Sequence, residues 1–262
     1  MSRQNFYKSR KVRQRKKVDE LLVKCLVEAE RAAQPRLGGL KLHSMLREEL
    51  EAENVSLGRD RFFEVLRNQA LLLEPLPKAP RTTNSAHSLP VFTNLIKDMD
   101  LTGPNQVWVS DITYIRTLED FAYLSLITDK YSRKVVGYHL GQTLEAQATL
   151  KALKMALRDL PDGIHPIHHS DRGSQYCCHE YVKELKAHGM AVSMTEEDHC
   201  AENALAERMN GILKQEYFLN YEFRTVAQAR RAVDEAVRLY NKRRPHRSLK
   251  LRTPEEVHRL AA

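Results

Sequence analysis

The chain has 262 residues and a formal net charge of +8, from 42 Lys and Arg against 34 Asp and Glu. No stretch approaches the roughly 18 consecutive apolar residues of a membrane-spanning helix, so we expect no membrane partner. The four cysteines, two of them adjacent, do not form the paired pattern of a disulfide framework. The basic start lacks the apolar core and cleavage site of a signal peptide, so we expect a cytoplasmic protein.

Basic residues gather at both ends of the sequence. The first 17 residues hold eight Lys or Arg and no acid, and residues 224–262 hold eleven Lys or Arg against four Asp or Glu. Neither end combines its charge with a strongly apolar opposite face, which disfavours a membrane surface. Two basic runs on either side of a segment with an acidic cluster favour a nucleic-acid partner.

Three helices are predicted in the first part of the chain. Apolar residues recur with the helical period over residues 11–33, 40–50 and 59–69. Helices joined by short turns are typical of a helix-turn-helix module, so we assign residues 1–73 to a small all-α DNA-binding region. Its candidate DNA contacts are Arg59 and Arg61, in the third helix. A helical packing domain without DNA contacts is the alternative.

The next segment, residues 74–106, differs in composition. It holds five of the ten prolines of the chain. Proline fixes φ and removes a backbone donor, so we predict an extended linker and a domain boundary here. A short helix is expected only over residues 92–98.

Strands and helices alternate in the central part of the chain. Runs rich in β-branched and aromatic residues predict three consecutive antiparallel strands, and an amphipathic helix, a strand, a helix capped by Ser174 and a short strand follow. The predicted strands cover residues 107–116, 121–129, 134–140, 164–169 and 191–194, and the helices cover 145–160 and 174–188. This order predicts an α/β domain with a mixed five-stranded sheet flanked by helices.

Three acids have a distinctive spacing. Asp111 lies in the first predicted strand, Asp171 follows the fourth after 59 intervening residues, and Glu207 comes after 35 more. Glu207 lies in a predicted helix whose same face carries three polar side chains, Asn203, Asn210 and Lys214. Alone, this helix would be an ordinary amphipathic surface helix. Together with two strand aspartates, it can bring three carboxylates to one place.

Four motifs follow one another in the chain: WVSDITYI around Asp111, HHSDRGSQY around Asp171, ENALAERMNGILKQE around Glu207, and the tail YNKRRPHRSLKLRTPEE. Over about residues 10–258 the sequence resembles the retroviral-integrase superfamily of DDE transposases, and within it the second reading frame (OrfB) of the insertion-sequence family numbered three. The resemblance implies a ribonuclease-H-like catalytic core over 107–222, a basic C-terminal helix and tail over 223–262, and a bacterial, nucleoid-associated protein.

Converging carboxylates repel one another unless a cation lies between them. Oxygen ligands suit Mg²⁺ or Mn²⁺, and two ions roughly 3.5 to 4 Å apart can clamp the attacking and leaving oxygens of an in-line phosphoryl displacement. We therefore expect Asp111, Asp171 and Glu207 to be catalytic and to hold two ions, with Asp111 between them. The resemblance implies strand cleavage at the element's ends, followed by strand transfer from the freed 3′-hydroxyl.

Further DNA contacts are expected beside the acids. Lys214 follows Glu207 by two helical turns and would hold a terminal phosphate or base, whereas a plain surface lysine is the alternative. Thr113 shares the strand face of Asp111 and would touch DNA or pack within the sheet. Two amides of the helix would bond a DNA end or an ordered water, or cap the helix: Asn203 and Asn210. The basic tail, which ends the predicted fold, adds Arg243, Arg244 and Arg247.

Two other groups of residues are assigned structural roles. Histidines and cysteines crowd between His168 and His179, but their spacing fits no tetrahedral zinc site. The sequence around Asp129, ITDKYSR, predicts a turn and not a fourth active-site acid.

The expected partners are the terminal inverted repeats of the element and target DNA, bound by a homo-oligomer. The resemblance implies that OrfB often acts when fused to an upstream OrfA product, and no sustained heptad appears in this chain, so an OrfA-type partner or fusion is expected. Two alternatives are a ribonuclease-H-like nuclease that hydrolyses DNA without strand transfer, and a DNA-binding subunit that is inactive without its partner.

Overall fold

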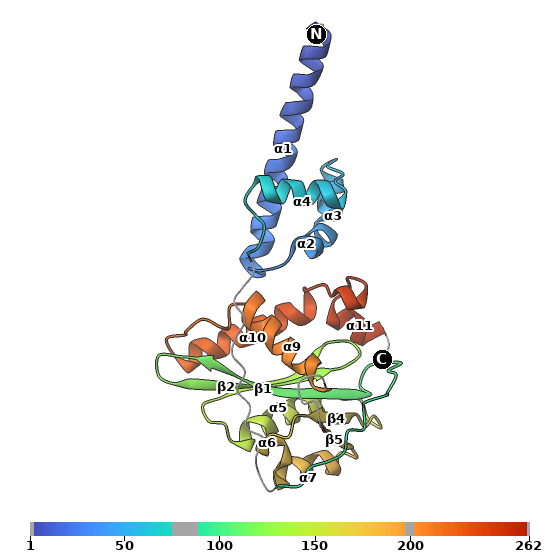
Figure 1. The fold of residues 1–262 in the computed structure, drawn as a ribbon, viewed down its shortest axis with the longest axis vertical. Coiled ribbons are helices and arrows are strands. Elements are labelled where there is room, and N and C mark those ends of the chain that lie inside the picture. Colours follow the sequence, from blue (N-terminus) through green and yellow to red (C-terminus); the bar gives the residue numbers. More distant parts are fainter. Residues whose placement is uncertain (1–2, 75–88, 197–201, 261–262) are drawn as a thin grey trace. The chain divides into compact units, whose positions relative to one another are not determined.

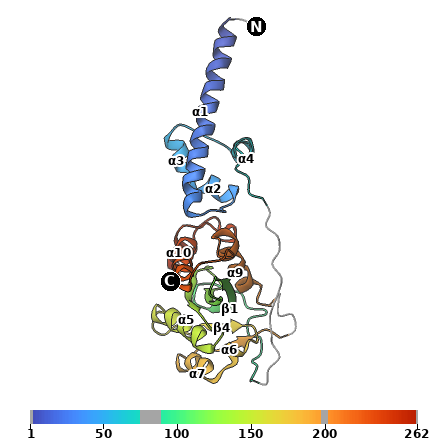
Figure 2. The same ribbon diagram turned by 90° about the vertical axis from the view of Figure 1, so that its left-hand side faces the viewer.

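The computed structural model describes residues 3–74, 89–196 and 202–260. The chain divides into two compact units, Met1–Pro77 and Lys78–Ala262, which are described separately below (Figures 1 and 2). Most of the proline-rich part of the predicted linker, residues 75–88, lies outside the described ranges. Among the helices within those ranges, none has the length and apolar character that a bilayer crossing requires.

The N-terminal unit is all-α. Its helices are α1 (Arg3–Ala33), α2 (Gly39–Met45), α3 (Arg47–Ala52) and α4 (Arg59–Asn68). They share a core that includes Val23, Val27, Leu42 and Phe62. An ion pair of 2.9 Å between Arg61 of α4 and Glu20 of α1, two residues 41 positions apart in sequence, joins these helices.

Two helix limits in this unit differ from the prediction. Helix α1 begins at Arg3 and not at residue 11, because residues 3–10 contain no glycine or proline to stop it. The second predicted helix is divided at Leu46 into α2 and α3. Leu42, Leu46 and Leu50 are all buried on the two sides of this break.

The C-terminal unit is built on a five-stranded sheet. Its strands are β1 (Val107–Arg116), β2 (Phe121–Asp129), β3 (Val135–Gly141), β4 (Ile167–Ser170) and β5 (Val192–Met194), in the order β3-β2-β1-β4-β5. The first three strands are antiparallel, whereas β4 is parallel to both β1 and β5. The predicted mixed sheet is thus confirmed. Strand β4 begins three residues later than predicted because Pro166 has no N–H for the ladder.

Helices cover both faces of the sheet (Figure 1). One layer holds α5 (Ala146–Arg158), α6 (Ser174–Cys177) and α7 (His179–Ala187), and the other holds α9 (Ala204–Glu216), α10 (Val226–Lys242) and α11 (Pro254–Leu260). Trp108, Ile127 and Tyr181 belong to the core on the first side. Leu124 and Tyr240 belong to the core on the second. The result is the predicted ribonuclease-H-like arrangement of a sheet between two helical layers.

Helix α5 approaches the sheet closely at Gly137 of β3. A Cβ added there would lie 2.3 Å from the backbone oxygen of Ala152 in α5. Only glycine fits at this point, and α5 therefore packs directly onto the strand backbone.

Three local predictions were wrong. Residues 92–98 form no helix, because the backbone N–H groups of Asn94 and Leu95 donate to the side chains of Glu196 and Ser193, both at 2.9 Å. The helix predicted over 174–188 is divided at Cys178, which is extended. Its first cap is Gly173, and Ser174 is already helical.

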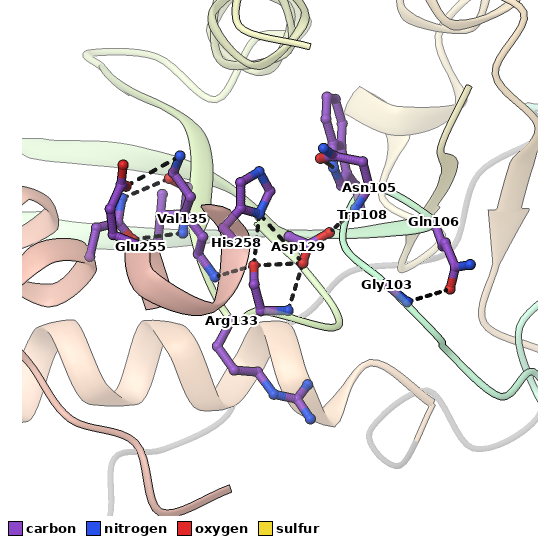
Figure 3. Close-up of polar contacts among 12 residues, drawn as sticks. Gly103, Asn105, Gln106, Trp108, Asp129, Arg133, Val135, Glu255 and His258 are labelled. Atoms are coloured by element: carbon purple, nitrogen blue, oxygen red, sulfur yellow. Dashed lines mark hydrogen bonds and ion pairs between the residues drawn. The ribbon is translucent and has the colours of Figure 1, made fainter. Parts of the chain in front are cut away.

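The prediction that the basic tail ends the fold was wrong, because α11 follows the tail and returns to the sheet (Figure 3). Its His258 Nδ1 lies 2.9 Å from Ser132 Oγ, and Ser132 donates to the buried carboxylate of Asp129 at 2.6 Å. Lys134 and Glu255 form a second contact of 3.2 Å. Asp129 thus organises the turn between β2 and β3, as its sequence context predicted.

Candidate active site

The two aspartates lie at neighbouring positions of the parallel strand pair β1 and β4. Ser110 of β1 and Ser170 of β4 are register partners, and Asp111 and Asp171 are the next residue on each chain. Strand β4 ends at Ser170 while β1 continues, so both carboxylates lie where the parallel pairing stops. Two acids with 59 residues between them in the sequence therefore lie side by side.

A tight turn holds Asp171 at the end of β4. Its Oδ1 accepts a hydrogen bond of 3.0 Å from the backbone N–H of Gly173. A Cβ at Gly173 would lie 3.0 Å from the same oxygen, so the glycine gives the carboxylate room. The next residue, Arg172, donates from Nε to the backbone oxygen of Thr195 at 2.6 Å and ties the turn to the residue after β5.

The charge on Asp111 is poorly compensated. Burial, followed by the nearby charge of Asp171, raises the pKa of Asp111 to about 7. Hydrogen bonds from Asn210 and from the N–H of Ile112 oppose this rise in pKa, and Glu207 adds a smaller rise. A buried carboxylate whose pKa is raised by a second carboxylate is a common feature of sites that bind a cation.

Helix α9 lies along β1 through two amides. Asn203 donates to the backbone oxygen of Ser110 at 3.1 Å, and Asn210 donates to Asp111 Oδ2 at 2.8 Å. Both side chains are buried. They therefore hold the helix and the carboxylate of Asp111 in place, and neither side chain makes the capping hydrogen bond that the sequence left open as the alternative.

Glu207 lies between these amides on α9, but its side chain is exposed and does not join the aspartates. It lines a separate hollow with Arg208 and Gln215. Within the described ranges, no group of three or more His, Cys, Asp or Glu side chains is placed to hold a metal ion. The structure thus brings two of the three predicted acids together and leaves the third at the edge.

A cavity of about 580 Å³ opens beside the two aspartates. Thr113 lines it, on the strand face where the sequence placed it. So do two tyrosines that the sequence analysis did not select, Tyr114 and Tyr123. The volume is within the roughly 300 to 1,000 Å³ of small-ligand sites.

Lys214 lies at one end of this region. Its Nζ is 4.0 Å from the ring centroid of Tyr114. Burial lowers the pKa of Lys214 to about 8, while Asp111 raises it and Arg116 lowers it further. The side chain is therefore not a plain surface lysine, because it carries its charge toward the acids.

The arginines expected to contact DNA differ in their surroundings. Arg244 is buried and bonds both oxygens of Glu216 at 2.7 Å, so the expectation that it contacts DNA was wrong. Arg61 is engaged with Glu20 and Glu64, which favours a packing role. The side chains that remain exposed are those of Arg59, Arg243 and Arg247.

The histidines near Asp171 belong to the core. His168 Nε2 lies 2.8 Å from both Ser110 Oγ and Tyr181 OH, and burial lowers the pKa of His168 to about 3. His169 Nδ1 lies 2.9 Å from Ser193 Oγ. These contacts support the strands that carry the acids. Sequence reasoning missed the network, although two histidines in a strand of four residues signalled a buried polar layer.

Comparison with known proteins agrees with this geometry. Two models described as integrase core domain match residues 102–200 and 188–254. The chain is 38% identical over 223 residues to the insertion element IS600 uncharacterized 31 kDa protein of Shigella sonnei, an alignment that covers 83% of this chain and 82% of that protein. It is 38% identical over 174 residues to the transposase InsF for insertion sequence IS3A of Escherichia coli, covering 65% of this chain and 60% of InsF.

The fold also matches a solved structure. A chain in the cryo-EM structure of the simian T-cell lymphotropic virus intasome in complex with PP2A regulatory subunit B56 gamma aligns with a TM-score of 0.52 and 19% identity, over 83% of this chain and 73% of that chain. At this identity the match speaks for the fold alone. The alignment with InsF spans less than two thirds of InsF, whereas the alignment with the IS600 protein spans most of both chains. The chain belongs to the insertion-sequence transposases of the IS3 type, DDE polynucleotidyl transferases that share the integrase core domain.

Proposed function

We propose that this chain cleaves DNA strands at the ends of its insertion element and joins them to a target, with Asp111, Asp171 and Glu207 as the catalytic acids. The observation that carries the proposal is the pair of aspartates where the parallel pairing of β1 and β4 stops, buried enough to raise the pKa of Asp111 to about 7. Both aspartates line a cavity of about 580 Å³.

The donor set fits a divalent cation. A cation between two carboxylates relieves the repulsion of their like charges, and oxygen ligands suit Mg²⁺ or Mn²⁺. Asp111 and Asp171 would hold the ion that both touch, and Glu207 would complete a second site. When bound, the ions would polarise the phosphodiester and activate the attacking oxygen.

The residues of the chain have separate tasks in this proposal. Asn210 holds Oδ2 of Asp111 and the N–H of Ile112 holds Oδ1, so the carboxylate is fixed in place, and the remaining lone pairs of its oxygens would bind the cation. The N–H of Gly173 holds Oδ1 of Asp171. Lys214 carries its positive charge toward the acids, where it would bind a phosphate of the cleaved strand. Thr113 lines the cavity through which that strand would pass.

The basic segments would hold DNA outside the catalytic cavity. Arg59 of the N-terminal unit and two arginines after α10, Arg243 and Arg247, are exposed and are proposed as phosphate contacts. The proposed DNA partners are the terminal inverted repeats and target DNA. Because both ends of an element must be held for joining, the protein would act as a homo-oligomer on DNA.

The position of Glu207 supports a second candidate function, in which this chain binds DNA but cuts it only with a partner. Glu207 is exposed and lies outside the pair of aspartates. DNA or an OrfA-type partner that draws Glu207 inward would complete the site. This candidate predicts that Mg²⁺ and DNA alone give no cleavage, whereas addition of the partner does.

A strand-transfer assay with the element's own end sequences in Mg²⁺ or Mn²⁺ tests the proposal. We expect cleaved and joined products from the parent chain, and none from Asp111→Asn, Asp171→Asn or Glu207→Gln. DNA affinity should stay within a few-fold for all three, because they remove metal ligands and not phosphate contacts. A variant that retains Mg²⁺-dependent joining removes its residue from the site. Cleavage without joining would favour a hydrolytic nuclease.

A further inference from the structure

Three aromatic rings lie together on β1 and β2. Tyr114 of β1 and Tyr123 of β2 are register partners, so their side chains lie on the same face of the sheet. Tyr114 and Phe121 form an edge-to-face pair with ring centroids 5.5 Å apart and an interplanar angle of 85°. We call Tyr114, Phe121 and Tyr123 the aromatic platform.

The platform is not part of the hydrophobic core of the described residues. None of its three members belongs to a buried cluster, and Phe121 is 44% exposed. Other strand residues nearby, such as Ile115 and Leu124, are fully buried. Tyr114 and Tyr123 are half-buried, so packing of the sheet core does not account for the three rings, and a contiguous apolar patch at the surface marks an interaction site.

The platform is continuous with the catalytic cavity. Tyr114 and Tyr123 line the same cavity of about 580 Å³ as Asp111 and Asp171. A nucleotide whose phosphate lies at the aspartates would therefore have its base within reach of these rings.

Charge around the platform points to the same occupant. The Lys214 ammonium lies 4.0 Å from the Tyr114 ring centroid, and Arg116 on the same strand is exposed. Aromatic rings beside basic side chains form the usual surface for single-stranded nucleic acid, in which rings stack on bases and cations bind phosphates. An apolar peptide would gain nothing from the two cations.

We propose that the aromatic platform stacks on an unpaired base of the DNA strand whose phosphodiester lies at Asp111 and Asp171. The proposal rests on the proposed function, because it takes the aspartates as the place of the phosphodiester. A duplex end must open for one strand to enter the cavity, and the unpaired base then loses its neighbours. Stacking on Tyr114 would replace them and hold the strand open. Lys214 would move from the ring to the phosphate.

The test compares the affinity of two DNA duplexes with a short single-stranded 3′ tail, one with normal bases in the tail and one with abasic sugars. Binding is measured in EDTA, so that the readout does not need catalysis. The parent chain should prefer the tail with bases by about 5- to 150-fold, the range for stacking of one base on an aromatic ring. Tyr114→Ala should lose this preference, whereas Tyr114→Phe, which keeps the ring, should retain it.

Two control variants separate stacking from charge and from folding. Lys214→Gln should weaken binding to both duplexes alike, because it removes a phosphate contact. Leu118→Ala, at an exposed position in the turn between β1 and β2, should leave the preference unchanged. Thermal unfolding of each variant shows whether it is folded. A parent chain without the preference, or a folded Tyr114→Ala variant that keeps it, would overturn the proposal.

The same preparations distinguish this inference from the proposed function. If Asp111→Asn still cleaves DNA in Mg²⁺ while the preference for bases depends on Tyr114, the catalytic assignment fails and the base site stands. If Asp111→Asn is inactive and the preference is absent, only the base site fails. If a protein partner occupies the platform, Tyr114→Ala binds both duplexes as the parent does, and the proposal is refuted.

Discussion

Replacement of Arg244 tests whether the tail arginines act on DNA or on the fold. Arg244 follows α10 and bonds both carboxylate oxygens of Glu216 at the end of α9, each at 2.7 Å. Its Nη1 lies 2.6 Å from His246 Nε2, and its guanidinium lies 5.6 Å from the Tyr240 ring centroid. The side chain is 4% exposed and that of Glu216 is 21% exposed. Arg244 therefore joins the helix that carries Glu207 to the helix that follows it.

Arg244→Ala would leave the Glu216 carboxylate without this partner. Removal of one member of a buried ion pair costs about 3 to 5 kcal/mol, and the partial exposure of Glu216 places the expected loss near the lower end, about 3 kcal/mol. In a domain of this size each kcal/mol lowers Tm by about 2 to 4 °C, so we expect a drop of about 6 to 12 °C.

Urea unfolding gives the free energy, and a salt titration of DNA binding gives the number of phosphate contacts. Arg244→Ala should lower the free energy of unfolding and leave the salt dependence of DNA binding unchanged. Arg247→Ala, at an exposed neighbouring position, should do the reverse and reduce the salt slope by about 1. The reasoning is refuted if Arg244→Ala unfolds like the parent and loses a phosphate contact.

Three further predictions concern packing, metal and charge. Gly137→Ala should destabilise the fold by about 3 kcal/mol or more, since its Cβ would meet the Ala152 oxygen at 2.3 Å. Gly211→Ala, with nothing near its Cβ, should stabilise the fold by about 0.5 to 1 kcal/mol. Equal urea midpoints for the two variants would contradict this reasoning. Millimolar Mg²⁺ should raise the Tm of the parent but not of Asp111→Asn, and equal shifts would remove Asp111 from the metal site. Burial lowers the pKa of Lys214 to about 8, so its ammonium loses a proton as the pH rises from about 7 to 9. Over this range the DNA affinity of the parent should fall more steeply than that of Lys214→Arg. Parallel pH profiles of the two proteins would argue against a contact between Lys214 and DNA.

The sheet could be predicted from the sequence because its signals are local. The runs that form β1 and β2 are rich in β-branched and aromatic residues, and their predicted limits match the structure at both ends. The position of Asp111 and Asp171 beside each other followed from the strand order, since both come where the parallel pairing of β1 and β4 stops. Helix α9 was predicted from its amphipathic period.

Other features depend on contacts between distant segments and leave no local signal. Arg244 looks like its neighbours in a basic run, and only the approach of Glu216, 28 residues away, makes it a buried ion-pair partner. Helix α11 was missed because its docking depends on His258 meeting Ser132, 126 residues away. Tyr114 did not stand out because aromatic residues in strands usually enter the core, and the strand pattern alone does not show that Tyr114 is half-buried beside Lys214.

The two amides of α9 limit what must change for Glu207 to reach the aspartates. Asn203 and Asn210, on either side of Glu207, already bond to β1. A shift of the whole helix would break both hydrogen bonds and leave buried amides without partners, at about 1 to 3 kcal/mol each. A new rotamer of Glu207 costs about 0.5 to 2 kcal/mol of side-chain freedom and keeps both bonds. We therefore expect that Mg²⁺ changes the side chain of Glu207 and leaves amide hydrogen exchange in α9 unchanged. Faster exchange throughout α9 on adding Mg²⁺ would show instead that the helix itself moves.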